Sequence, residues 1–331
     1  MKVLAGDIGG TKTLLQVVEY RAGVPVFGEV VRFSSRDFDR FEALLDSFLA
    51  RQPKHVLQGI DAACFAVAGP VDSQNQTARV TNLPWTLESQ SLARQLGDTV
   101  AVRLVNDFYA VGLGVSALNP TDLVSLQSGV RRPDAPALVV GAGTGLGVAQ
   151  VLRLDSGLEV LPSEGGHLAF SPRSEEETAL QAQLRDRFGR VSWERLVSGT
   201  GLVNIYRYFW QRNTPGNPDC PPLLSGAEDP GAAIAAAARA GRDPNASQAV
   251  ALFVRLYGTV AGELALVTLP FGGVYLAGGI APKLVDELRQ GPFLAAFHDK
   301  GRMQPLTAAM PVDIVMDTEV GLKGAALAAL R

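Results

Sequence analysis

The chain has 331 residues and a mass of 35.0 kDa, which suits about two domains of roughly 150 residues each. Hydrophobic residues make up 47% and charged residues 19%, as in a packed globular protein and not in a disordered one. Thirty basic and 33 acidic side chains give a net charge of −3 and a pI near 5.7, so the charge favours neither a nucleic-acid nor a membrane partner.

Cysteine content and apolar patterning point to a reducing compartment. Cys64 and Cys220 are too few for a disulfide framework or a four-thiolate zinc site. The first ten residues reach glycine and aspartate before a signal-peptide core can form. The most apolar long stretch, 246–280, contains Arg255 and Glu263, which disfavours a membrane span. We therefore expect a cytoplasmic protein.

Glycine-rich loops follow short apolar runs at two places in the chain. The run at 3–5 leads into GDIGGTKT at 6–13, and the run at 138–140 leads into GAGTGLG at 141–147. A second apolar run follows each loop, so both segments predict a strand, a tight turn and another strand. The two occurrences lie about 135 residues apart, which indicates a diverged duplication and two similar lobes.

The rest of the chain alternates between strand and helix patterns, which is typical of an α/β protein. The proline-rich segment 214–231 is predicted to be an exposed loop. We predict strands at 62–67, 100–105 and 274–277, and helices at 38–49, 89–96, 108–113, 175–188, 201–211, 232–240 and 246–269.

Both glycine loops are candidates for phosphate binding, although neither matches a standard motif. The first has Thr11 where a P-loop needs glycine before Lys12, and the second has Leu146 where a dinucleotide motif needs its last glycine. Backbone N–H groups of such hairpins still bind phosphate, and Asp7 is placed to approach a metal ion. A plain tight hairpin is the alternative for each loop alone. Together the two loops favour a two-sided phosphate clamp.

Three polar clusters are candidate ligands for a small molecule. Asn106 and Asp107 directly follow a predicted strand, where α/β proteins bind ligands, although an aspartate there also suits a helix cap. Paired glycines between Glu164 and His167 bring an acid and an imidazole to one turn. The NLPW segment at 82–85 offers an amide and an aromatic face, although a core tryptophan is the simpler interpretation.

These segments resemble the bacterial ATP-dependent glucokinases of the hexokinase and actin-like ATPase superfamily. Ser163 and Thr200 stand where glycine and proline are common in that family. Related ROK-type sugar kinases carry a Cys-x-Cys zinc cluster, which a solitary Cys220 does not match, so we expect no zinc. The matching segments run in the family's order: LAGDIGGTKT (4–13), AVAGPV (66–71), TNLPW (81–85), LVNDFYAVG (104–112), VVGAGTGLGVA (139–149), EGGHLAFSPRSEEE (164–177), SWERLVSGTGLVNIYR (192–207) and FGGVYLAGGI (271–280).

The resemblance implies an α/β fold of the two-lobed, actin-like ATPase (ribonuclease H-like) kind, with a cleft between the lobes that glucose closes. The small lobe is expected to be 1–112, joined by a C-terminal helix at 317–331, and the large lobe 113–316. The implied activity is the ATP-dependent phosphorylation of D-glucose to glucose 6-phosphate, the first step of glucose use in glycolysis, by a homodimer. Alternatives are a kinase for mannose, fructose or N-acetylmannosamine, and a sugar-sensing regulator, which the intact Asp107 disfavours.

The same resemblance assigns individual residues. Asp107 is the expected catalytic base, and Mg²⁺ is expected to accompany ATP, with Asp7 reaching it through a water molecule. The sugar ligands implied are Asn106, Asp107, Glu164, His167 and Glu194, with Asn82 and Gly69 as secondary contacts. The ATP contacts implied are Gly6, Asp7, Ile8, Gly9, Gly10, Thr11, Lys12, Gly143, Thr144, Gly278 and Gly279.

Overall fold

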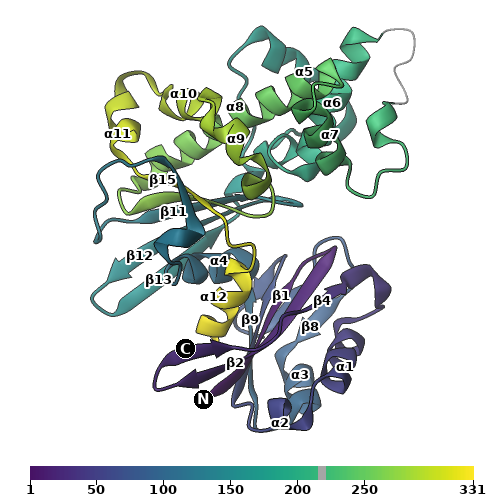
Figure 1. Ribbon diagram of the computed structural model, residues 1–331, viewed down its shortest axis with the longest axis vertical. Helices are drawn as coiled ribbons and strands as arrows, with labels where there is room; N and C mark the ends of the chain where they lie inside the picture. Colours follow the sequence, from purple (N-terminus) through teal and green to yellow (C-terminus); the bar gives the residue numbers. More distant parts are fainter. Residues whose placement is uncertain (215–220) are drawn as a thin grey trace. The chain divides into compact units, whose positions relative to one another are not determined.

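A computed structural model describes residues 1–214 and 221–331, which form two compact units (Figure 1). Unit 1 comprises residues 1–121, 160–162 and 319–331, and unit 2 comprises 122–159 and 163–318. The chain thus changes unit near 121 and 318, where the sequence suggested 112 and 316. Part of the predicted 214–231 loop, residues 215–220 with Cys220, lies outside the described residues.

Unit 1 is built on a six-stranded mixed sheet in the order β3-β2-β1-β5-β9, with β4 also paired to β2. Strands β1 and β2 form the first predicted hairpin, and β1, β5 and β9 run parallel. A small antiparallel sheet, β6-β7-β8, follows β5. The strands are β1 Lys2–Ile8, β2 Lys12–Arg21, β3 Val24–Phe27, β4 Val31–Ser34, β5 Ala62–Val67, β6 Val71–Asp72, β7 Thr77–Arg79, β8 Thr86–Glu88 and β9 Ala101–Asn106.

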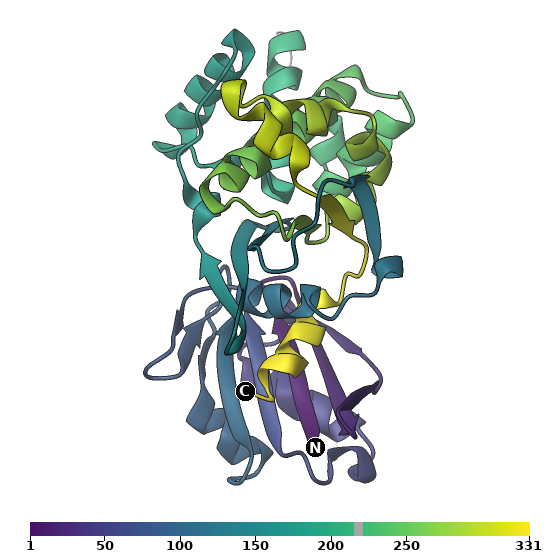
Figure 2. The same cartoon turned by 90° about the vertical axis from the view of Figure 1, so that its left-hand side faces the viewer.

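Helices cover both faces of the unit 1 sheet. The apolar side chains of α1 and α3 share a buried cluster with Leu4, Ile8 and Phe65 of the central strands. Helices α4 and α12 pack side by side (Figures 1 and 2), and a Cβ on Gly324 of α12 would clash with the carbonyl oxygen of Ala110. Close approach of the two helices therefore requires glycine there. The helices are α1 Phe41–Arg51, α2 Lys54–Leu57, α3 Ser89–Leu96, α4 Asp107–Val115 and α12 Val320–Ala328.

Unit 2 contains a second six-stranded sheet, in the order β10-β15-β14-β11-β12-β13. Strands β11 and β12 form the second predicted hairpin, and β11 runs parallel to β14, as β1 does to β5 in unit 1. The two hairpins that the sequence indicated are therefore confirmed as parts of two similar sheets, although in unit 2 the strand β10 precedes the hairpin. The strands are β10 Leu123–Gln127, β11 Ala137–Ala142, β12 Leu146–Leu154, β13 Gly157–Ser163, β14 Gly273–Ala277 and β15 Val312–Val315.

A long helix, α8, forms the centre of the unit 2 core. It is the one helix among residues 1–214 and 221–331 with the length and hydropathy of a membrane span, but 72% of its apolar window is buried inside the protein. It packs against α6, α7 and α10, which explains its apolar character as core packing. The helices are α5 Glu175–Phe188, α6 Gly199–Asn213, α7 Pro230–Arg239, α8 Pro244–Thr268, α9 Val285–Arg289, α10 Pro292–His298 and α11 Gln304–Ala309.

Candidate active site

In unit 1, three loops and a helix start meet at one edge of the sheet. Ile8, Val67 and Asn106 are aligned across the parallel strands β1, β5 and β9. The segments that follow these residues therefore leave the sheet within about 10 Å of one another, the width of two strand spacings. This edge is the carboxyl end of the strands, where open α/β sheets bind ligands.

Two glycines let these unit 1 loops approach closely. Gly69 has a φ of +155°, and a Cβ there would clash with the carbonyl oxygen of Arg79. A Cβ on Gly10 would lie 2.7 Å from the carbonyl oxygen of Thr81, which immediately precedes Asn82. The hairpin tip and the segments around Gly69 and Asn82 are thus packed backbone against backbone, so these three expected contacts are brought together.

The segment Asn106–Asp107 forms the start of α4. The Oδ1 atom of Asn106 accepts hydrogen bonds from the N–H groups of Phe108 and Tyr109, at 2.9 and 3.3 Å. The helix cap considered for Asp107 is therefore made mainly by Asn106. Asp107 Oδ1 also accepts from Phe108 N–H, at 2.9 Å, so the carboxylate is held in a fixed orientation. Asn106 Nδ2 donates to the carbonyl oxygen of Gly69, at 3.4 Å.

Asp7 is the acidic side chain of the first hairpin. Burial raises the pKa of its carboxyl group above the ordinary value, and the positive charge of Lys12 lowers it in part. A Cβ on Gly321, in the first turn of α12, would lie 3.1 Å from Asp7 Oδ2. The helix N-terminus is a favourable environment for a carboxylate. Asp7 is therefore a partly desolvated carboxylate whose ionised form a cation would stabilise.

In unit 2, the second hairpin tip adjoins the glycines that follow β14. Ile280 N–H donates to the carbonyl oxygen of Ala142 at 3.2 Å, and a Cβ on Gly278 would lie 2.5 Å from the same oxygen. Gly278 has a φ of +82°, which glycine adopts without strain. Thr144 is exposed at the hairpin tip. The structure thus brings Gly143 and Thr144 near Gly278 and Gly279.

The EGGH segment forms a short 3₁₀ helix, Gly165–His167, against the start of β12. His167 Nε2 lies 3.7 Å from Glu164 Oε2, and both side chains are exposed to solvent. A Cβ on Gly166 would clash with the carbonyl oxygen of Leu146, so the turn can sit against the hairpin only with glycine there. Arg190 donates a hydrogen bond to the carbonyl oxygen of His167 at 2.8 Å, which stabilises the turn.

Glu194 lies in a second 3₁₀ helix, Trp193–Arg195, which packs beside the first one. Its Oε2 atom accepts a hydrogen bond from Leu146 N–H at 3.0 Å. The expected ligands Glu164, His167 and Glu194 are therefore grouped around one residue of the second hairpin. A pair of carboxylates and an imidazole around one turn suits recognition of sugar hydroxyl groups.

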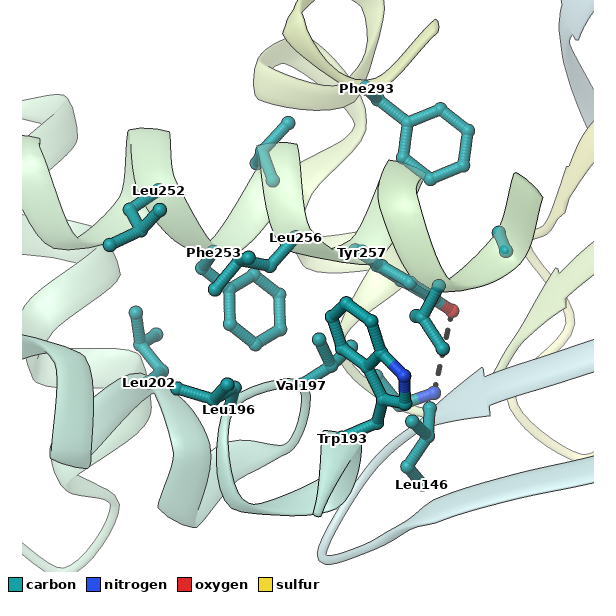
Figure 3. Packing of buried hydrophobic residues seen from close by; sticks show 14 of the residues in the cluster. Leu146, Trp193, Leu196, Val197, Leu202, Leu252, Phe253, Leu256, Tyr257 and Phe293 are labelled. Carbon is teal, nitrogen blue, oxygen red and sulfur yellow. Dashed lines mark hydrogen bonds between the residues drawn. The ribbon is translucent and has the colours of Figure 1, made fainter. Parts of the chain in front are cut away.

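The core beneath the hairpin fixes these positions (Figure 3). Leu146 and Trp193 lie side by side in the cluster that packs on α8, and Trp193 packs edge-to-face on Phe170. The Tyr257 hydroxyl donates to the carbonyl oxygen of Val140 at 3.0 Å and accepts from Ala142 N–H at 3.4 Å. Burial raises the pKa of that hydroxyl, which keeps it protonated as a donor.

Sequence reasoning missed the side chains that support the site. Ser163 Oγ accepts from Gly165 N–H at 3.1 Å, and Ser198 Oγ caps α6 by accepting from Gly201 N–H at 3.0 Å. Serine is a preferred N-cap residue, so the serine before Gly199 could have been predicted from the sequence to cap this helix. The Oγ1 atom of Thr200 lies 3.0 Å from the Oγ atom of Ser198. Ser163 and Thr200, the two residues that depart from the family pattern, therefore both make local hydrogen bonds. Trp85 is buried in the unit 1 core, so the core interpretation of this tryptophan is confirmed.

Comparisons with known proteins show similarity to glucokinases over nearly the whole chain. The family model described as Glucokinase matches residues 4–331. A curated glucokinase of Nostoc sp. is 43% identical over 345 residues and covers 99% of both chains. A crystal structure of a glucokinase from an Antarctic psychrotroph has a TM-score of 0.81 at 27% identity, covering 99% of this chain and 98% of its own. A ROK family glucokinase from Streptomyces griseus, in complex with glucose and AMPPNP, has a TM-score of 0.66 at 23% identity, covering 100% and 99%.

Proposed function

The chain belongs to the glucokinase family, and from that premise we propose how its residues phosphorylate D-glucose. The activity is ATP-dependent transfer of a phosphoryl group to glucose, giving glucose 6-phosphate. The observation that carries our assignment is the position of Asp107, fixed by Phe108 N–H at the carboxyl end of β9. We assign the catalytic role to this carboxylate.

Asp107 orients the 6-hydroxyl group of glucose and accepts its proton during transfer. Carboxylates are much weaker bases than alkoxides, so the proton moves late, after the bond to phosphorus has begun to form. Positioning and charge stabilisation supply most of the rate enhancement in phosphoryl transfer. The two-residue segment Asn106–Asp107 suits this task because backbone hydrogen bonds fix both side chains.

Recognition of glucose is assigned to Asn106, Glu164, His167 and Glu194, with Asn82 and Gly69 as secondary contacts. Polar groups that a bound sugar shields from water discriminate well between sugars, because a missing or inverted hydroxyl group leaves them without a partner. The separation of 3.7 Å between His167 Nε2 and Glu164 Oε2 supports the assignment, since two groups this close can contact the same small molecule.

The ATP phosphates are assigned to the two hairpin tips, Gly9–Lys12 and Gly143–Thr144, and the adenosine to Gly278 and Gly279. A magnesium ion fits Asp7, because Mg²⁺ is typically held by one or two carboxylates together with phosphate oxygens and waters. When bound, the ion neutralises part of the charge of the triphosphate. Lys12, beside Asp7 in the hairpin, adds a fixed positive charge.

The proposal also covers the zinc requirement, the oligomeric state and the cellular location of the protein. Among residues 1–214 and 221–331 no group of three or more His, Cys, Asp or Glu side chains is arranged to hold a metal ion. We propose a cytoplasmic homodimer that needs no zinc and binds neither nucleic acid nor membrane. Elemental analysis of tag-free protein and light scattering check the first two points: stoichiometric zinc or a monomer contradicts them.

A coupled assay over a panel of hexoses with ATP and Mg²⁺ tests the function. We expect the highest kcat/KM for glucose, with the phosphate on O6 by NMR of the product. A kcat/KM at least tenfold higher for mannose, fructose or N-acetylmannosamine would assign the chain to that sugar instead.

A further inference from the structure

The tip of the β11–β12 hairpin, residues 142–146, is tied at two points to the segment 194–199. Leu146 N–H donates to Glu194 Oε2 at 3.0 Å, and Gly199 N–H donates to the carbonyl oxygen of Gly143 at 2.8 Å. One bond comes from a side chain and the other from the first residue of α6. The segment that carries a proposed sugar ligand therefore also holds the proposed phosphate loop.

The Glu194 carboxylate also lies against the backbone of Gly145. A Cβ built on Gly145 would overlap Glu194 Oε2 and would lie 3.3 Å from its Cδ. By contrast, a Cβ on Gly143, two residues earlier in the same tip, would meet nothing within 4 Å. The carboxylate thus packs against Gly145 and not against Gly143, and a methyl group on Gly145 would push the carboxylate away.

The backbone of Glu194 is itself fixed. Ser198 Oγ donates to the carbonyl oxygen of Glu194 at 2.7 Å, while the neighbouring Trp193 is buried in the core. The remaining freedom lies in the Glu194 side chain. A carboxylate has about four acceptor positions, so one held by Leu146 N–H still accepts from a sugar hydroxyl group.

We propose that Glu194 is a positioning residue that couples the sugar and nucleotide sites: a sugar hydroxyl group holds the carboxylate against Gly145 and so fixes the hairpin for ATP. This inference rests on the proposed function, because it takes Glu194 as a sugar ligand and the hairpin as a phosphate loop. The hydrogen bonds to Leu146 N–H and to the sugar also spread the negative charge that would otherwise repel the phosphates. Coupling free energies are reciprocal, so bound nucleotide must strengthen glucose binding by the same factor.

The experiment measures that factor by calorimetry on the full chain, as the ratio of the glucose Kd without and with saturating Mg²⁺–AMPPNP. For the wild type we expect a ratio of at least about 5, the lower end of typical allosteric coupling. Gly145→Ala and Glu194→Gln should bring the ratio to within about twofold of 1. Gly143→Ala, the matched control in the same tip, should keep the wild-type ratio even if its nucleotide affinity changes.

The variants separate coupling from damage to either site. If Glu194→Gln abolishes glucose binding, Gly145→Ala decides, because it removes no proposed ligand side chain; if Gly145→Ala fails to fold by circular dichroism, Glu194→Gln decides. A wild-type ratio of 1, a Gly145→Ala ratio equal to the wild type, or an equal loss in Gly143→Ala overturns the inference. A wild-type protein that neither binds nor phosphorylates glucose overturns the proposed function itself, which is a different result.

Discussion

The two glycine hairpins share a topology but obtain their polar groups in different ways. In unit 1 the β1–β2 hairpin carries its own charges, Asp7 and Lys12, and its tip packs against the backbone oxygen of Thr81. In unit 2 the β11–β12 hairpin has no charged side chain between residues 141 and 147. Its carboxylate comes from Glu194, about 50 residues further along the chain.

The neighbours of each hairpin differ in the same way. Beside the first lies Asp107, held by a backbone N–H at a helix start, and beside the second lies the solvent-exposed pair Glu164 and His167. We infer that unit 1 provides the chemical step and that unit 2 provides much of the sugar recognition. Substitutions in the two units should then divide between kcat and KM.

The largest effect is expected for Asp107→Asn. General-base catalysis contributes about 10²–10⁴-fold, so kcat should fall by at least about 10² while the glucose Kd stays within about tenfold. Steady-state kinetics and calorimetry measure the two quantities, with the melting temperature as a control for folding. A variant that keeps more than a tenth of the wild-type kcat contradicts the assignment of the chemical step to unit 1.

Glu164→Ala and His167→Ala test the other side of the comparison. A hydrogen bond to a charged group contributes about 1.5–3 kcal/mol, so the KM for glucose should rise about 10- to 100-fold. The kcat should change much less, and the preference for glucose over its epimers should narrow. Leu168→Ala is the matched control, because this side chain is 53% exposed on the same turn. If sugar selectivity is unchanged in both variants, the turn is structural only.

The sequence predicted the local structure well because the determinants are local. The apolar run at 62–67 matches β5 residue for residue, and the pattern at 175–188 matches α5, whose cap Ser174 precedes three acidic residues. Both hairpins were found from glycines that follow apolar runs. Residues that belong to one motif, such as Glu164 and His167, were paired because only two glycines separate them.

Contacts between distant segments were not predictable in this way. Nothing in the local pattern around Glu194 shows that its carboxylate meets Leu146 N–H, because that contact depends on how the core places Trp193 beside the hairpin. Likewise the raised pKa of Asp7 arises from burial, which includes the packing of α12 from the far end of the chain. Such effects need the tertiary structure, since spacing in the sequence does not encode them.

A smaller effect is expected when the same substitution is made in both hairpin tips. Gly10→Ala places a Cβ 2.7 Å from the oxygen of Thr81, which is backbone and cannot rotate away. Overpacking of this kind costs about 1–3 kcal/mol, so the melting temperature should fall by at least about 2 °C. Gly143→Ala meets nothing within 4 Å and should change it by less than about 1 °C. Equal changes in the melting temperatures of the two variants, measured by circular dichroism, would contradict the difference between the two tips.

The smallest effect is expected for Asp7→Asn, at the position where the second hairpin has Ala142. Burial raises the pKa of Asp7 in the folded state, so ionising this group costs stability once the pH exceeds its unfolded pKa of about 3.9. At pH 7 without ligands the amide avoids that cost, and we expect the melting temperature to rise by about 2 °C. The gain should vanish as the pH falls to about 4 and below, because the carboxyl group is then increasingly protonated in the unfolded state as well as in the folded state. The KM for Mg²⁺–ATP should rise at the same time, because the oxygen ligand for the cation loses its charge.

Asp72→Asn is the matched control of opposite sign: the hydrogen bonds from Asn75 and Gln74 lower the pKa of Asp72, so this variant should gain no stability at pH 7. A lower melting temperature for Asp7→Asn at pH 7, or a gain that persists at pH 4, would show that the carboxylate of the first hairpin is there for stability and not for the cation.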